Sequence, residues 1–437
     1  MKDPMIVDLF AGPGGLDVAA HWLGIPSVGI EFDESAVRTR EAAGLSSIFS
    51  DVRSWRPTDF SSAVNVLAGG PPCQTYTVAG NGHGRLALTR VIQLVRQLGH
   101  GLIDEVVAEA SAQSDPRTGL VLQPLIWALL AIEAGRPFEA IMLEQVPQVR
   151  LVWDVMAEVL ESRGYGTDVA VLRTEEYGVP QTRRRAVLIA RHGIPSTVVK
   201  LPWTTHRRYD GRVLESDAIP GIGCKLPRWV TMGEALKIDE PFVVVSNYGT
   251  GGDPRNRGRR NQDCPAFTVT GKASRNKIVM ADGGGTQRFG PKEAGRLQTF
   301  PDGYPWAGCD VSQQIGNAIP PRLGAHVLCS LLGIEPRPDE AFFAERQSAW
   351  KSPTRAVQTR VRDAIIRCDV LEKSPTLIVG PSDCAEYREP VKAYAPLTRG
   401  RHTVQEDSIS DRHRVRGSRG PDSEPDRPGA AVSEQGI

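Results

Sequence analysis

The sequence predicts an α/β fold, with a doubly wound, mostly parallel sheet and a second, smaller and less regular domain. Two observations carry this prediction. Short apolar runs alternate with helical patterns through the first 190 residues, and the alternation fades after His192, where Gly, Pro, Arg and Asn become frequent. Because parallel strands need crossover connections, such alternation is typical of a sheet covered by helices on both faces.

The expected strands and helices follow one another closely at the N-terminus. Met5–Phe10 and Ser27–Glu31 are predicted as strands, and Leu16–Leu23 and Glu34–Ala43 as helices. The same patterns then predict strands at Val64–Ala68, Ala140–Glu144 and Ala186–Ala190, a helix near Leu151–Arg163 and a long helical insert over Leu86–Ala112.

Changes in composition along the chain predict its domain organisation. The tail from Gly400 onward has no aromatic residue and few aliphatic ones, so it is expected to be disordered. The predicted parts are a first α/β domain (1–191, with the helical insert 86–114), a second and less regular domain (192–287), a return to the first domain (288–333), a C-terminal extension (334–399) and the tail (400–437).

The composition of the chain indicates a soluble protein with reduced thiols. The 437 residues are 40% hydrophobic and 24% charged, as in an ordinary soluble protein, and the net charge of +1 gives no global sign of a polyanionic partner. Seven cysteines without a C-x-x-C pair indicate reduced thiols, and no Cys or His spacing predicts a metal site. Without a signal peptide or a membrane-spanning run, the protein is expected in the cytoplasm and not at a membrane.

A glycine-rich turn, Ala11-Gly12-Pro13-Gly14-Gly15, lies between the first expected strand and helix. Such a turn lets the backbone approach a ligand at a helix N-terminus, although it does not fit G-x-G-x-x-G and is equally compatible with a tight structural turn. Glu31 and Asp51 lie near the ends of the next segments, where carboxylates can accept hydrogen bonds from a nucleotide-type ligand. Taken singly, either acid could instead be a solvated surface residue.

The segment Pro71-Pro72-Cys73-Gln74 follows an apolar strand and carries the candidate nucleophile. Two prolines fix the backbone just before the thiol, so the sulfur of Cys73 is aimed rather than free to move. A polarisable nucleophile held in this way suits covalent attack on an electron-poor carbon. An isolated cysteine is more often buried and inert, and the neighbouring residues decide against that reading.

Basic residues cluster within the second domain. Arginines suit phosphate and guanine, but such runs mostly contact phosphates without reading the sequence. The candidate DNA-binding residues are Arg255, Arg257, Arg259, Arg260, Lys272 and Arg275.

Seven short motifs follow one another over about residues 5–333. They read DLFAGPGG at 8–15, GIEFD at 29–33, GGPPCQ at 69–74, LEQV at 143–146, YGVPQTRRRAVLIA at 177–190, GRLQTFPDGYPW at 295–306 and QIGNAIPPRLG at 314–324. In this order they resemble the DNA (cytosine-5) methyltransferase family, and the order makes the similarity far more specific than any single motif.

The resemblance implies a Rossmann-like methyltransferase fold that uses S-adenosylmethionine. It implies that residues 1–191 are the catalytic and cofactor-binding domain and that residues 192–287 are the target-recognition domain. It implies that Cys73 is the nucleophile, that Glu144 contacts the cytosine edge and that Arg183 and Arg185 form an active-site pair. Gln74 joins the candidate DNA contacts. The expected cofactor-binding residues are Phe10, Gly12, Gly14, Glu31, Asp51, Pro71 and Asn317.

The implied reaction is transfer of a methyl group to C5 of a flipped-out cytosine in a specific double-stranded DNA sequence, through an adduct of Cys73 with C6. The loop Thr75–Arg85 could close over the base, or could be a plain connector. Arg183–Arg185 could also be a phosphate clamp or a solvated surface run. The expected state is a monomer associated with the nucleoid, acting alone or beside a separate restriction endonuclease.

One departure and two rivals accompany this reading. The family usually has Asn after the motif glutamate, whereas this chain has Gln145, so the support of the nucleophile loop is in question. A tRNA cytosine-C5 methyltransferase would use the same catalytic set, and a catalytically dead DNA-binding regulator could use the same scaffold. The size of region 192–287 argues against the first rival, and the intact Cys73, Glu144, Arg183 and Arg185 argue against the second.

Overall fold

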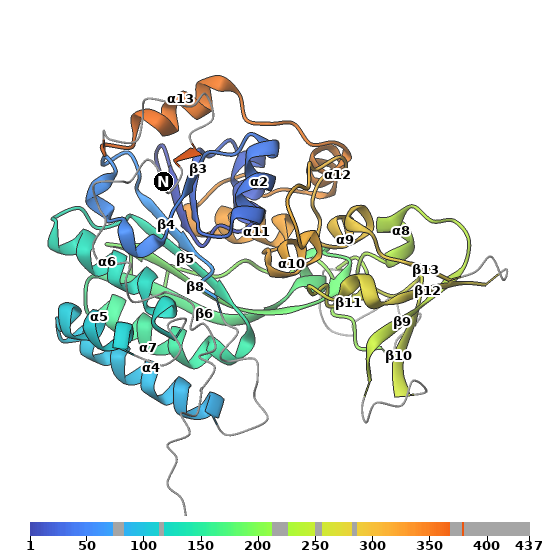
Figure 1. The fold of residues 1–437 in the computed structure, drawn as a ribbon, viewed down its shortest axis with the longest axis horizontal. Helices are drawn as coiled ribbons and strands as arrows, with labels where there is room; N and C mark the ends of the chain where they lie inside the picture. The colour runs from blue at the N-terminus through green and yellow to red at the C-terminus, as the bar shows by residue number, and fades with distance from the viewer. Residues whose placement is uncertain are drawn as a thin grey trace, which may run out of the picture. The chain divides into compact units, whose positions relative to one another are not determined.

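The computed structural model describes residues 1–72, 83–112, 118–211, 226–249, 256–281, 286–367 and 378–379 (Figure 1). Most of the loop Thr75–Arg85, which could close over the base, and all of the tail 400–437 lie outside these residues. None of the described helices is both long and apolar enough to cross a bilayer.

An eight-stranded sheet confirms the predicted α/β class. Its order is β14-β3-β2-β1-β4-β5-β8-β6, with β8 antiparallel to both neighbours and the other strands parallel. The strands are β1 (Ile6–Leu9), β2 (Ser27–Glu31), β3 (Ser47–Phe49), β4 (Val66–Gly69), β5 (Ala140–Gln145), β6 (Tyr165–Arg173), β8 (Arg184–His192) and β14 (Ile378–Val379).

Helices cover both faces of this sheet because its central strands are apolar on both sides. On one face, α4 (His83–Gly99), α5 (Ile103–Ala112), α6 (Gln123–Glu133) and α7 (Arg150–Glu161) pack on alternate residues such as Leu67 (Figure 1). On the other face, α1 (Gly15–Trp22) and α11 (Pro321–Leu332) pack on the intervening residues, such as Val66. The alternation of two side-chain sets along each strand therefore divides the core in two.

The N-terminal half follows the predicted elements closely. β2 and α2 (Glu34–Ala43) begin and end as expected, and Asp33 caps α2 by accepting a hydrogen bond from the Ala36 amide at 2.8 Å. The long insert is two helices, α4 and α5, because the chain turns at Gly101, which has a positive φ of 85°. β3 and β6 were not predicted.

A four-stranded antiparallel sheet lies within the region that was expected to be irregular. Its order is β10-β9-β12-β13, and a small apolar cluster that includes Phe242 and Ile278 packs it against α8 and α9. The strands are β9 (Phe242–Gly249), β10 (Arg257–Asn261), β12 (Lys277–Met280) and β13 (Thr286–Arg288), and the helices are α8 (Met232–Leu236) and α9 (Pro291–Leu297). Short strands β7 (Gln181–Thr182) and β11 (Ala266–Phe267) pair in parallel and join this region to the strand β8.

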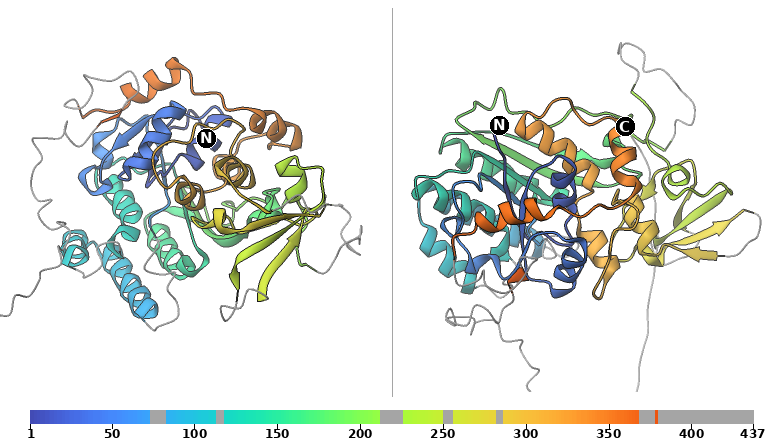
Figure 2. Two further views of the ribbon diagram at one scale, coloured as in Figure 1. Left: turned by 45° about the vertical axis from the view of Figure 1, so that its right-hand side comes forward. Right: turned by 90° about the horizontal axis from the view of Figure 1, so that it is seen from above.

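The segment after residue 333 packs on the eight-stranded sheet. Helices α12 (Glu340–Ser348) and α13 (Arg355–Asp363) contribute Phe343 and Val361 to the two halves of the core. The orange segment lies beside the blue N-terminal elements in both views of Figure 2. The side chains of Trp350 and Gln358 donate hydrogen bonds to the carbonyl groups of Ala43 and Gly44 at the end of α2. This polar extension is therefore part of the folded body up to the last described helix.

Candidate active site

The predicted site residues gather at the carboxyl ends of neighbouring parallel strands. Phe10 follows β1, Glu31 ends β2, Pro71 follows β4 and Glu144 lies near the end of β5. β2, β1, β4 and β5 are adjacent in that order, so these four ends form one edge of the sheet. Open α/β sheets bind their ligands along this edge.

Glu31 organises the glycine-rich turn. Its carboxylate accepts hydrogen bonds from the backbone amides of Gly12 at 2.7 Å, Phe32 at 2.8 Å and Asp33 at 2.7 Å. Burial raises the pKa of Glu31, and the three amides oppose that shift. A carboxylate has about four acceptor positions, so capacity remains for a hydroxyl donor of a ligand.

The two predicted glycines serve different purposes. Gly14 has a φ of 100°, and a Cβ placed there would lie 2.3 Å from Leu45 Cδ1, so this position needs glycine for packing. Gly12 has a φ of 54°, yet no atom lies within 4 Å of such a Cβ. The open space beside Gly12 and Glu31 fits the close approach of a nucleoside-type cofactor.

The side chains of Asp51 and Asn317 form hydrogen bonds with neighbouring residues of the protein. The Asp51 carboxylate accepts hydrogen bonds from the Arg53 amide and guanidinium, both at 2.9 Å. Asn317 is exposed at the end of α10 (Val311–Asn317), where its side chain accepts a hydrogen bond from Gln313 at 2.7 Å. Their contact with a cofactor stays a prediction.

The chain leading to Cys73 runs beside Glu144, although Cys73 and Gln74 lie outside the described residues. A Cβ on Gly70 would lie 3.9 Å from Glu144 Oε2. The Gln145 side chain donates a hydrogen bond to the Pro71 carbonyl and accepts one from the Val146 amide. Gln145 therefore holds the start of the segment that leads to Cys73, which answers the question raised by its departure from the family pattern.

Glu144 is paired with Arg185 across two antiparallel strands. Arg185 Nε lies 2.7 Å from Glu144 Oε1, and both side chains are only 12–13% exposed. Strands β5 and β8 are in register beside them, with Glu144 opposite Val187. This pair is the predicted catalytic carboxylate with one of the two predicted arginines.

Arg183 lies in a different environment from Arg185. Its side chain is 1% exposed and donates hydrogen bonds to the carbonyl groups of Val269 at 2.8 Å, Gly316 at 2.9 Å and Ala318 at 3.2 Å. It thus holds the two residues that flank Asn317. The two arginines do not converge as a pair on Glu144, and any contact of either with a substrate stays a prediction.

Two buried glutamines near Arg183 were missed by sequence reasoning. Gln181 accepts a hydrogen bond from the Val269 amide at 2.9 Å and donates to the Leu297 carbonyl at 2.8 Å. Gln298 donates to the Ile315 carbonyl at 3.1 Å. Both glutamines lie within the stretches that resemble the family, at 177–190 and 295–306, and this position could have identified them.

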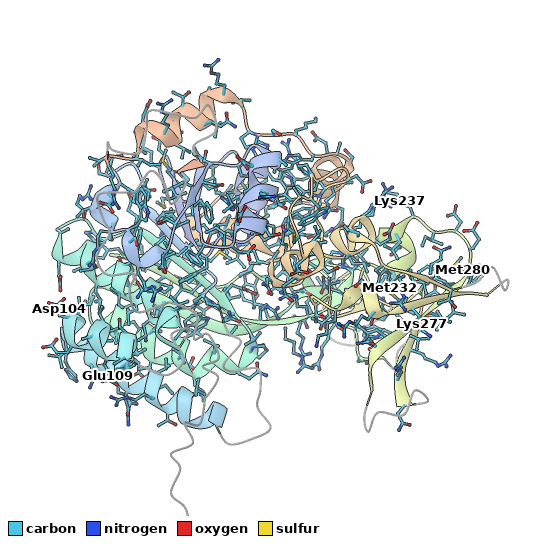
Figure 3. All side chains as sticks on the ribbon, in the orientation of Figure 1. Asp104, Glu109, Met232, Lys237, Lys277 and Met280 are labelled. Carbon is cyan, nitrogen blue, oxygen red and sulfur yellow. The ribbon has the colours of Figure 1, made fainter. Side chains whose placement is uncertain are left out.

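The predicted DNA-binding residues divide by exposure. Arg259, Lys272 and Arg275 are exposed and Arg257 is half-buried, whereas Arg255 lies outside the described residues. Figure 3 labels Lys277 among the side chains of the same four-stranded sheet. Arg260 differs from the other basic residues, because its guanidinium donates hydrogen bonds to Thr182 and to two carbonyl groups within the protein. Contact of any of these residues with DNA stays a prediction.

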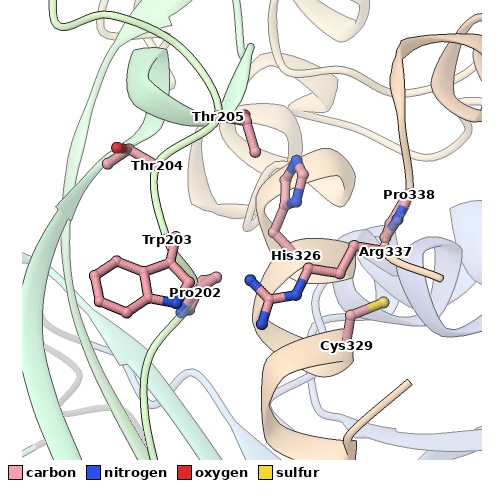
Figure 4. Close-up of a pocket in the computed structure, with 8 residues that line it drawn as sticks. All are labelled: Pro202, Trp203, Thr204, Thr205, His326, Cys329, Arg337 and Pro338. Atoms are coloured by element: carbon pink, nitrogen blue, oxygen red, sulfur yellow. The ribbon is translucent and has the colours of Figure 1, made fainter. Parts of the chain in front are cut away.

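A cavity of about 200 Å³ lies apart from all of these residues (Figure 4). It lies between the segment Pro202–Thr205 and α11, and its lining includes His326, Cys329 and Arg337. None of the predicted site residues lines it.

Curated proteins and solved structures resemble the chain over most of its length. Type II methyltransferase M.Eco47II of Escherichia coli is 27% identical over 346 residues, 73% of this chain and 76% of that protein. Type II methyltransferase M.Sau96I of Staphylococcus aureus is 24% identical over 365 residues, 76% of each chain. The crystal structure of S. pombe Dnmt2 methyltransferase has the same fold, with a TM-score of 0.51 and 16% identity over 75% of this chain and 98% of that one.

The family model described as C-5 cytosine-specific DNA methylase matches residues 5–95, 116–219 and 225–332. These ranges contain the edge of the sheet at which Glu31, Glu144 and Arg185 lie, and together they span well over half of the chain. The chain therefore belongs to the C-5 cytosine-specific DNA methylase family and is a DNA (cytosine-5) methyltransferase.

Proposed function

We propose that the protein methylates C5 of cytosine within a specific double-stranded DNA sequence, through a covalent adduct of Cys73 with C6 of a flipped-out base. The ion pair of Glu144 with Arg185, beside the segment that leads to Cys73, is the observation that supports this most directly. A carboxylate and a guanidinium beside this segment support a role for both groups in holding the cytosine that the thiol would attack.

S-Adenosylmethionine would be held at the glycine-rich edge of the sheet. Glu31 keeps acceptor capacity for ribose hydroxyls beside the open backbone at Gly12, and Phe10 is half-buried at the end of β1. Asp51, Pro71 and Asn317 complete the proposed set. When bound, this cofactor supplies a methyl group on a positively charged sulfur.

Cys73 would begin the reaction as a thiolate that forms a bond to C6 of cytosine. The electron pair of the C5–C6 double bond then makes C5 nucleophilic, so that C5 takes the methyl group and the methyl–sulfur bond breaks. A base next removes the C5 proton, the double bond re-forms and the bond from C6 to Cys73 breaks. Glu144 would share a proton with N3 and so stabilise the charge that develops on the ring.

The cytosine must leave the duplex to reach Cys73, because C5 and C6 are stacked inside it. Exposed Arg259, Lys272 and Arg275 would hold the DNA backbone, together with the half-buried Arg257 of β10. Arg255 and Gln74 remain proposed contacts outside the described residues. We place the protein with its DNA in the cytoplasm, as a monomer that acts alone or with a separate restriction endonuclease.

A methyl-transfer assay tests this proposal. Purified protein would receive labelled S-adenosylmethionine with unmethylated duplex DNA or with tRNA, and nucleosides would be analysed by mass spectrometry. We expect 5-methylcytosine in DNA and its loss in Cys73→Ala. Product in tRNA alone would transfer the activity to RNA, and DNA binding without product would indicate a regulator.

A further inference from the structure

Arg260 joins the four-stranded sheet to the strand that precedes the catalytic arginine. Its Nη1 donates hydrogen bonds to Thr182 Oγ1 at 2.9 Å, the Pro265 carbonyl at 2.8 Å and the Ala266 carbonyl at 2.9 Å. The same guanidinium lies 4.2 Å from the centre of the Phe267 ring and 4.9 Å from that of Tyr209. Arg260 therefore touches three separate parts of the chain, namely Thr182, the segment 265–267 and Tyr209.

The contact with Thr182 leads directly toward the candidate active site. Thr182 belongs to β7 and pairs with Phe267 of β11, and its carbonyl accepts a hydrogen bond from Thr268 at 2.6 Å. The chain continues from Thr182 into β8, which carries Arg185 and through it the ion pair with Glu144. Only two residues separate Thr182 from Arg185.

The neighbouring residue on β10 provides an internal comparison. Arg259 is exposed, and its side chain has no hydrogen bond or ion pair with another residue in the described part of the chain. Adjacent residues on a strand point to opposite faces, so one arginine can meet DNA while the other is held inside the protein. The two neighbours therefore form a matched pair, in which one arginine is exposed and the other is bonded within the protein.

We propose that Arg260 is a positioning residue that couples the DNA-binding face of β10 to Arg185 and Glu144, so that target engagement aligns the catalytic pair. The proposal rests on the proposed function and deepens it. A planar guanidinium can lie between two rings and donate several hydrogen bonds in fixed directions, which a lysine ammonium cannot do in the same way. Loss of Arg260 would loosen β10 and β11 from β7 while leaving the exposed arginines present.

The matched variants Arg260→Met and Arg259→Met test this division of roles. Single-turnover methylation would be measured at saturating DNA, and the DNA Kd would be measured across a salt series. Arg260→Met is expected to slow methylation by roughly 10-fold to 100-fold, the effect of a small misplacement of reacting groups, with little change in Kd or its salt dependence. Arg259→Met is expected to weaken binding and reduce the salt slope by about one, with a much smaller effect on rate.

A double-mutant cycle separates positioning from general loss of structure. Thr182→Val removes the hydroxyl that Arg260 bonds and keeps the side-chain shape. If the coupling passes through this contact, the rate lost in Arg260→Met with Thr182→Val is clearly smaller than the product of the two single losses. Arg260→Lys retains the charge and should recover little of the rate, and thermal unfolding of each variant identifies any that fail to fold.

The outcomes distinguish this inference from the proposed function. A wild-type protein that makes no 5-methylcytosine would overturn the function and the coupling together. An active wild type whose Arg260→Met variant loses DNA affinity and salt slope as Arg259→Met does would make Arg260 a DNA contact, and would overturn the coupling alone. Independent effects of Arg260→Met and Thr182→Val on the rate would overturn it as well.

Discussion

The two sheets of this protein differ in how deeply their strands are buried. In the eight-stranded sheet, β1 and β4 are buried along their whole length between two layers of helices. In the four-stranded sheet, all three residues of β13 are exposed, and β10 is a run of Arg, Gly and Asn with no fully buried residue. The first sheet is buried on both faces, so its functional residues lie at the ends of its strands. The second sheet has residues along its strands that are exposed to solvent.

This difference teaches how the two sheets would contribute to methylation. A sheet covered on both faces fixes the ends of its strands rigidly, and that rigidity suits the alignment of Glu31, Glu144 and Arg185. An antiparallel sheet can leave one face to solvent, where charged residues can meet DNA. Chemistry and recognition should therefore respond differently to mutation.

The largest expected effect lies at the catalytic pair. Glu144→Gln removes the group that we propose shares a proton with the cytosine ring, so we expect methylation to fall roughly 1,000-fold. DNA binding should change little, because the exposed residues of the other sheet are intact. The rate and the DNA Kd would be measured together, with the exposed Glu158→Gln as control. A loss of binding equal to the loss of rate would remove the distinction between the sheets.

The next effect is on the stability of the eight-stranded half. Asp17 and Arg40 form an ion pair at 2.6 Å with both side chains fully buried. Asp17→Asn leaves the Arg40 charge without its partner, so we expect a loss of about 3–5 kcal/mol of unfolding free energy. Glu34→Gln breaks the exposed pair with Arg38 on the same helix and should cost less than about 1 kcal/mol. Urea unfolding of both variants checks the prediction, and equal losses would contradict it.

A smaller effect is expected on the exposed face. Lys272→Ala and Arg275→Ala each remove one exposed positive charge, so each should reduce the salt slope of DNA binding by about one. The relative preference for different DNA sequences should stay the same, because phosphate contacts carry no sequence information. Binding would be measured by titration at several salt concentrations. A changed sequence preference would instead identify a base contact.

The smallest effect concerns stability in acid. Burial lowers the pKa of His206 to about 4 and the pKa of buried His326 well below its usual value. The unfolded chain takes up these protons near pH 6.5, while the folded protein keeps both rings neutral, so stability falls as the pH is lowered from 6.5 toward 4. His326→Gln should reduce this slope by about 1 kcal/mol per pH unit. Parallel curves for wild type and variant, in urea unfolding at pH 7, 6 and 5, would disprove it.

Much of the eight-stranded half could be predicted from sequence because its patterns are local. β2 and α2 were predicted to the residue, since an apolar run and a capped amphipathic segment mark their own limits. The four-stranded sheet could not be predicted in the same way. Arg257–Asn261 lacks apolar alternation, and it is a strand because β9 supplies its hydrogen bonds.

The sequence by itself determined the α/β class, the order of the motifs and the residue types that the chemistry needs. Tertiary structure decided which of several similar arginines does what. Arg183 precedes β8 and is buried against carbonyl groups, whereas Arg185 reaches Glu144. Arg259 is exposed and Arg260 is held against Thr182, although they are neighbours in the chain. A guanidinium is the same group in every case, so its role depends on the partners that strand register and packing bring to it.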